Sequence, residues 1–198
     1  MPKVPLRPLL TIAVIAGFQI GLFSAFEAQQ AFHPDEPIDA GDESQLSSLG
    51  LSAEVQHDVF VATRGAMQSS MASMAPWYAV VRVLLALAGG AVFVLALRLR
   101  VLTEGRAEAS QLLGRAALVV AFLRTIDGAQ RLVVVRTTVH DVSKVMLEAK
   151  LDESYTAALG LVSAATVGWS LVVVSVFMAL ATYFRSERVR DALVREEG

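Results

Sequence analysis

The chain has 198 residues, of which 55% are apolar and only 18% are charged, and its mean hydropathy is +0.54. A soluble domain of this length would carry about 25% charged residues, so the composition favours a membrane protein. The net charge of −2 argues against nucleic-acid binding, since no basic face stands out. The absence of cysteine excludes disulfides, thiolate metal sites and a cysteine nucleophile.

Four apolar runs are long enough to cross a hydrocarbon core of about 30 Å. They cover residues 9–26, 77–97, 116–135 and 157–184. These runs predict an all-α integral membrane protein, with four transmembrane helices in an antiparallel bundle and a single membrane domain over residues 1–198. The third run is less apolar than the others because charged residues interrupt it.

The first run follows Lys3 and Arg7 and therefore shares the basic start of a signal peptide. Its apolar stretch is long for a signal peptide, and no clean small-residue cleavage site follows it, because Phe26 and Glu27 stand where the cut would fall. We expect a retained signal anchor.

Basic residues are distributed unequally between the connecting segments. The N-terminal tail, the connection 98–115 and the tail 185–198 together carry ten Lys and Arg, whereas residues 27–76 and 137–156 carry three. The positive-inside rule then places both termini in the cytoplasm, and we expect a multi-pass protein of a bacterial inner membrane.

The first external segment, residues 27–76, begins with an acidic linker rich in Pro, Gly and Ser. Ser52 is a candidate N-cap, and Glu54 would occupy the first turn of the helix that follows. Pro76 marks a break or a new helix start before the second span. The apolar residues of this external helix recur at helical spacing: Val55, Val59, Ala62, Met67, Met71 and Met74.

The other connections are also predicted to be helical or tight. The third span should extend outward into an external helical tip over residues 137–156. On the cytoplasmic side, Gly105 is expected to cap the end of the second helix. The tail 185–198 should continue the fourth helix, with a modest apolar edge formed by Val189, Leu193 and Val194.

Three charged residues lie in the middle of the third run: Arg124, Asp127 and Arg131. A charge at membrane depth costs at least about 2.5–3.5 kcal/mol, and helical geometry places these three within about 60° on one face. Asp127 can therefore pair with either arginine. The structural interpretation is a salt-bridge cluster that sets helix register. The functional interpretation is an ion path, a proton path or an anion site.

Arg82 lies about one turn inside the outer end of the second run. Snorkelling to the headgroups is its structural interpretation, and a contact with an external anion or lipid headgroup is the functional one. Small residues at four-residue spacing predict close helix packing, either within the chain or against a partner. They are Gly17 and Gly21 in the first run, and Gly160, Ala164 and Gly168 in the fourth.

His33, His57 and His140 all fall on the predicted external side, each near an acidic residue. They are weak candidates for a metal site, because no pair has ligand spacing within one helix. No cofactor is implied. The chain has no nucleophile elbow, P-loop or zincin motif, so we expect no enzymatic activity.

Three functional hypotheses follow. The first is a non-enzymatic subunit or scaffold of a bacterial envelope complex, with lipid and other membrane or envelope proteins, or further copies of the chain, as partners. The second is a small transporter or channel component that uses the Arg124–Asp127–Arg131 cluster. The third is an external sensor of a metal or small ligand.

Overall fold

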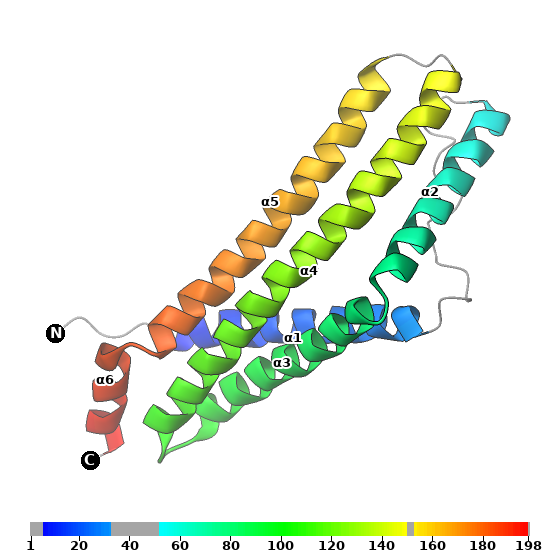
Figure 1. The fold of residues 1–198 in the computed structure, drawn as a ribbon. Helices are drawn as coiled ribbons and strands as arrows, with labels where there is room; N and C mark the ends of the chain where they lie inside the picture. The colour runs from blue at the N-terminus through cyan, green and yellow to red at the C-terminus, as the bar shows by residue number, and fades with distance from the viewer. Residues whose placement is uncertain (1–5, 33–51, 150–152, 198) are drawn as a thin grey trace. The chain divides into compact units, whose positions relative to one another are not determined.

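A computed structural model describes residues 6–32, 52–149 and 153–197. Within these ranges the chain forms six helices and no strand, in agreement with the predicted all-α class. Figure 1 shows them in chain order: α1 (Leu6–Phe32), α2 (Ala53–Met74), α3 (Trp77–Val101), α4 (Arg106–Glu148), α5 (Glu153–Phe184) and α6 (Glu187–Glu197).

Three of the described helices are long and apolar enough to cross a membrane. These segments are Leu6–Gln30, Trp77–Val101 and Gly160–Phe184, and they coincide with the first, second and fourth predicted spans. The predicted third span, residues 116–135, is not among them, because three charged residues interrupt its apolar sequence. The chain is thus a helical protein with three candidate membrane spans.

The chain divides into two compact units. The first contains Met1–Ala28, Val80–Ile126 and Ser170–Gly198, and the second contains Gln29–Ala79 and Asp127–Trp169. The long helices α4 and α5 each contribute one part to each unit.

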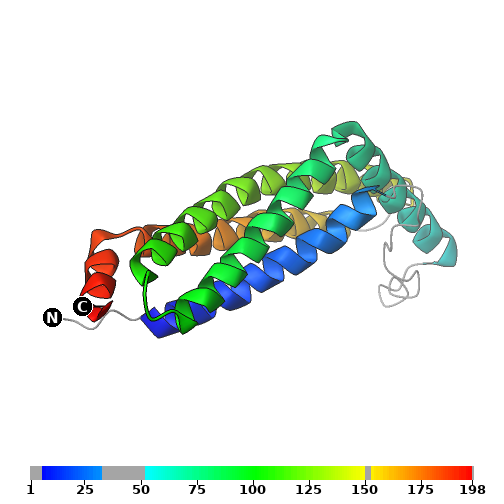
Figure 2. The same cartoon turned by 90° about the horizontal axis from the view of Figure 1, so that it is seen from below.

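The core of the first unit is formed by apolar residues of α1, α3, α4 and α5. Helices α1 and α3 lie side by side in it (Figure 2). Their contacts run in opposite residue order: Thr11 meets Arg100 and Glu27 meets Arg82. This pair is therefore antiparallel. The fully buried side chains include Leu85, Leu99, Leu113, Phe177 and Phe184.

The second unit has a smaller core between α2 and the second half of α4. Val59, Val142 and Met146 are buried there, with Val55, Ala62 and Val145 packed against them. The buried face of α2 continues through Ala66 and Ser70, whereas the predicted face continued through Met67, Met71 and Met74. Those methionines are only half-buried, because the small residues beside them occupy the inner face.

Two helix starts follow the predicted signals. The hydroxyl of Ser52 accepts a hydrogen bond from the backbone N–H of Val55, and Glu54 lies in the first turn of α2. Pro76 separates α2 from α3, and the second of these helices starts afresh at Trp77.

Gly105 has a different role from the predicted one. Its φ of +69° is a conformation that glycine adopts without steric cost. Its carbonyl accepts a hydrogen bond of 3.1 Å from the N–H of Ala109, the bond that opens α4. Gly105 therefore caps the start of α4, and α3 has already ended at Val101.

The predicted continuation of the fourth helix through the tail is wrong. Helix α5 ends at Phe184, and α6 begins at Glu187. The hydroxyl of Ser186 accepts a hydrogen bond from the N–H of Val189 at 3.4 Å, as an N-cap does. Val189 and Leu193 are buried, whereas Val194 is exposed, so most of the predicted apolar edge packs inside the protein.

Candidate functional site

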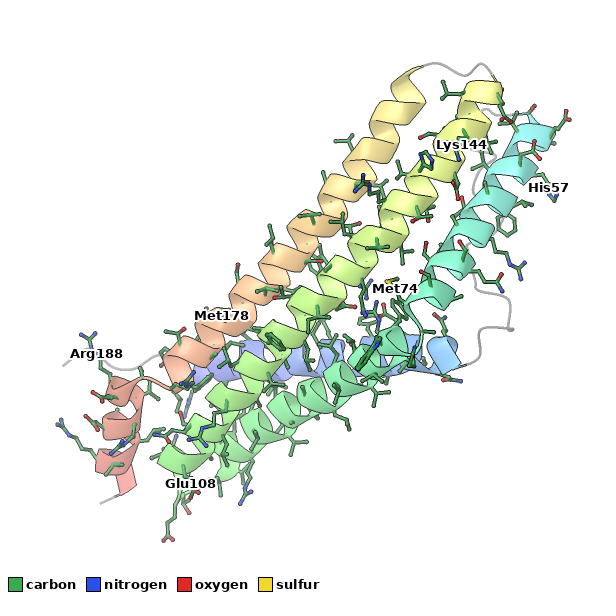
Figure 3. The ribbon with its side chains drawn as sticks, viewed as in Figure 1. His57, Met74, Glu108, Lys144, Met178 and Arg188 are labelled. Atoms are coloured by element: carbon green, nitrogen blue, oxygen red, sulfur yellow. The ribbon has the colours of Figure 1, made fainter. Side chains whose placement is uncertain are left out.

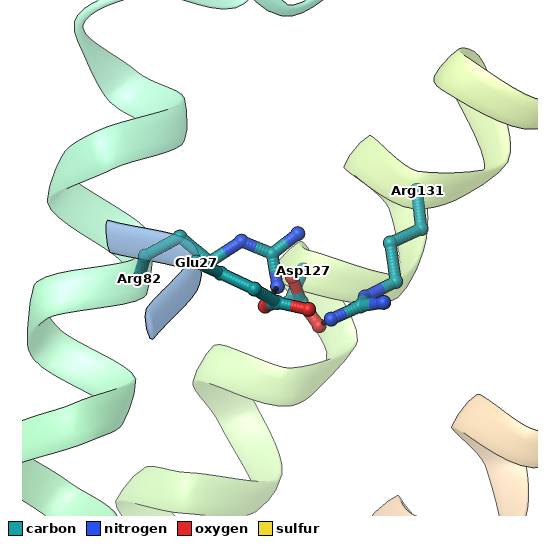
Figure 4. A network of polar contacts seen from close by, with 4 residues as sticks. All are labelled: Glu27, Arg82, Asp127 and Arg131. Carbon is teal, nitrogen blue, oxygen red and sulfur yellow. Dashed lines mark hydrogen bonds and ion pairs between the residues drawn. The ribbon is translucent and has the colours of Figure 1, made fainter. Parts of the chain in front are cut away.

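Arg82 is the largest completely buried side chain of the described residues, and its side chain has 0% exposure. Its Nη1 donates a hydrogen bond of 2.5 Å to Oε2 of Glu27, which lies near the end of α1 (Figure 4). The Glu27 side chain is 29% exposed. Arg82 therefore does not reach outward along α3, as a snorkelling arginine would; it joins α3 to α1 through an ion pair.

Sequence reasoning assigned Glu27 to the acidic external linker and missed this pair. Helix α1 extends to Phe32, six residues beyond the predicted end of the first span at residue 26, so Glu27 is a helical residue. One signal was present: Glu27 is the first acidic residue after an uninterrupted apolar run, and a buried arginine in another span needs such a partner.

Asp127 is likewise completely buried, on α4. Nε of Arg131 lies 3.1 Å from Oδ2 of Asp127, one turn further along the helix, and the Arg131 side chain is 31% exposed (Figure 4). Arg124, three residues before Asp127, is also buried. The one-face arrangement predicted for these charges thus contains an ion pair between positions i and i+4, Asp127 and Arg131.

The outer surface of α4 contrasts with its charged inner face. Between the exposed residues Arg115 and Arg136, every exposed residue of α4 is uncharged. This stretch of 20 residues is about 30 Å long, which matches the hydrocarbon core. The exposed residues are Leu118, Val119, Phe122, Thr125, Ala129, Leu132 and Val133.

Gly17 and Gly21 pack within the chain, against α3. A Cβ atom at Gly17 would lie 2.8 Å from the backbone N of Phe93, and one at Gly89 would lie 2.6 Å from the backbone N of Gly21. The two backbones therefore meet with no side chain between them. Gly114 of α4 makes a similar approach to Ala181 of α5 and to Arg185, the residue that follows α5. No periodic motif in the sequence predicted this contact.

The predicted packing residues of the fourth span lie in a different environment. Gly160, Ala164 and Gly168 are exposed, and a Cβ atom at either glycine would meet nothing within 4 Å among the described atoms. Large apolar side chains beside them, Leu161 and Trp169, are also exposed. This part of α5, residues 160–169, presents apolar and small residues outward.

The described histidines do not form a metal site. His57 on α2 and His140 on α4 are both exposed, and Figure 3 shows His57 extending outward from its helix. His33 lies outside the described residues. In the part of the chain that the structure describes, no group of three or more His, Asp or Glu side chains is placed to hold a metal ion.

Comparisons with protein-family models, with curated proteins and with solved structures find no match for this chain.

Proposed function

We propose that the chain is a non-enzymatic, four-span membrane protein that serves as a subunit or scaffold of a bacterial envelope complex. The observation that carries this proposal is the arrangement of charge in α4. Arg124 and Asp127 are buried, the Arg131 side chain that pairs with Asp127 is 31% exposed, and every exposed residue between Arg115 and Arg136 is uncharged. A helix with lipid outside and protein inside has this pattern. In this proposal α4 is the fourth membrane span, and α1, α3 and α5 are the other three.

The ion pairs favour a structural role over transport. Glu27 is paired with Arg82 and Asp127 with Arg131, and arginine stays protonated in proteins. A proton relay needs a chain of groups that gain and lose protons, which two arginine-paired acids do not provide. The Glu27–Arg82 pair instead joins α1 to α3 and favours one register between them, whereas the Asp127–Arg131 pair lies within α4.

The proposed orientation follows the basic residues. If α4 crosses the membrane, both termini, the turn between α3 and α4, and helix α6 lie in the cytoplasm. Helix α2 and the C-terminal end of α4 then lie on the external side. The exposed arginines of the cytoplasmic segments, among them Arg98, Arg100, Arg188 and Arg190, satisfy the positive-inside rule.

A partner helix fits best at residues 160–169 of α5. The exposed Gly160, Ala164 and Gly168 recur at the spacing that allows a second backbone to approach. Gly17 and Gly21, which have the same spacing, are already occupied by α3. We therefore assign the partner contact to α5 and propose a transmembrane helix of another membrane protein as its occupant.

The test is extraction from native membranes in a gentle detergent, followed by measurement of the mass of the intact particle. A photo-crosslinking residue at Leu161 should attach the chain to one stoichiometric partner, and the same residue at Leu87, an exposed apolar position of α3, should attach to lipid alone. A chain that is monomeric in detergent and crosslinks only to lipid from both positions would overturn the proposal.

A further inference from the structure

One cavity of the first unit combines basic and apolar walls. It has a volume of about 440 Å³ and is lined by Leu6, Arg7, Leu10, Thr11, Leu99, Arg100 and Arg106. None of the described residues that line it is acidic. We propose that this basic cavity binds the phosphate headgroup of an anionic phospholipid.

The positions of these residues place the cavity at the edge of the hydrocarbon core. Leu6 and Arg7 open the candidate span of α1, and Arg100 is the last residue but one of the candidate span Trp77–Val101. Basic pockets between transmembrane helices at this depth hold lipid headgroups. Arg106 is the first residue of α4, whose N-terminal N–H groups favour an anion.

One guanidinium of the cavity is held in place by a short network. Nη2 of Arg100 donates a hydrogen bond of 2.6 Å to Oγ1 of Thr11. The hydroxyl of Thr11 in turn donates to the backbone carbonyl of Arg7 at 3.1 Å. Because the hydroxyl proton is committed to that carbonyl, its oxygen is oriented to accept from Arg100, which fixes the guanidinium at the wall of the cavity.

The position of the cavity favours a lipid over a free phosphate. Leu10 and Leu99 are buried behind its wall, and Leu6 is half-buried there. Because the cavity lies at the ends of two candidate membrane spans, a phosphodiester can bind the arginines while its acyl chains extend along the apolar surface of these helices, whereas inorganic phosphate satisfies only the arginines. The acids of the adjoining segment, Glu104 and Glu108, are exposed and do not line the cavity.

The experiment uses the full chain in a mild detergent, with phosphatidylglycerol as the probe and phosphatidylcholine as its uncharged counterpart. Bound lipid is counted by native mass spectrometry during a titration. The variant R7Q/R100Q should bind phosphatidylglycerol about 25-fold more weakly, at about fivefold for each arginine near the membrane surface. The matched control R98Q/R188Q removes the same charge from exposed positions outside the cavity and should stay within about twofold of the parent.

Three results would overturn the proposal: equal losses in both double variants, no loss in R7Q/R100Q, or complete displacement of the lipid by millimolar inorganic phosphate. Thermal melts by circular dichroism verify that each variant is folded. If R7Q/R100Q does not purify, the single variants R7Q and R100Q are titrated instead, each with an expected loss of about fivefold. Because this site is independent of α5, its failure would leave the subunit role untouched.

Discussion

At the scale of single residues, Arg82 and Asp127 are the two charges that the fold encloses most completely. A buried charge is expensive unless an opposite charge compensates it, and removal of only one partner leaves the other uncompensated. Replacing both partners by apolar residues removes the cost together with the interaction. This asymmetry makes each pair testable by comparing single with multiple substitutions.

For the Glu27–Arg82 pair, the variant E27L should lose about 3 kcal/mol of unfolding free energy, at the lower end of the range for broken buried pairs because Glu27 is partly exposed. The double variant E27L/R82L should recover most of that loss. Equilibrium unfolding in mixed micelles, arranged as a double-mutant cycle, measures the coupling. Additive effects of E27L and R82L would show that the two side chains do not stabilise each other.

For the α4 charges, the variant D127L should lower the melting temperature and the yield of folded protein, because it removes the buried carboxylate that pairs with Arg131 and lies one turn from the buried Arg124. The triple variant R124L/D127L/R131L should fold better than D127L alone. Melting in detergent measures both. A D127N protein that is fully stable but shows an altered, pH-dependent ion flux in vesicles would instead favour the conducting alternative.

At the scale of helices, α1 and α3 meet through glycine backbones. A Cβ at Gly89 would meet backbone atoms of Gly21 and Gly17, which cannot move aside, whereas a Cβ at the neighbouring Gly90 would meet nothing within 4 Å in the described structure. We expect G89A to cost about 1–3 kcal/mol through overpacking and G90A to be neutral or slightly stabilising. Unfolding of the two variants in the same micelles gives the comparison, and equal effects would contradict the packing.

The helix ends show what sequence reasoning could and could not predict. Ser52 and Pro76 act through their own backbone neighbours, so local signals located them correctly. The break between α5 and α6 at Ser186 was not predicted, because apolar residues recur at helical spacing both before and after it. The end of α1 was placed too early because hydropathy falls at Glu27, although the helix continues to Phe32.

The same limit applies to the candidate site. Asp127 and Arg131 lie one turn apart, so their pairing follows from helical spacing alone. Glu27 and Arg82 are 55 positions apart, and only the packing of α1 on α3 brings them together. The close contact of Gly114 also depends on tertiary packing. A single glycine in a helix does not form a periodic small-residue motif, so the sequence alone does not predict the contact.

At the scale of the whole molecule, the decisive measurement is which side of the membrane each connecting segment occupies. Because the chain has no cysteine, a single introduced cysteine can be labelled without background from native thiols. Single cysteines at Glu104, Glu148 and Arg188 report the turn before α4, the end of α4 and helix α6. In intact cells, an impermeant maleimide should label position 148 and spare positions 104 and 188. Equal labelling of 104 and 148 would mean that α4 does not cross the membrane, and the three apolar helices would then be the whole membrane-spanning part.

The distance along the chain between Glu27 and Arg82 also has a consequence in time. Synthesis at about 5–20 residues per second separates the emergence of these two residues by roughly 3–11 s, since they are 55 positions apart. During that interval Glu27 has no Arg82 with which to pair, and Gly17 and Gly21 have no α3 to cover their backbone. The pairing of α1 with α3 therefore cannot form until α3 has been synthesised, so α1 passes through an early stage without the contacts that bury this face in the folded chain.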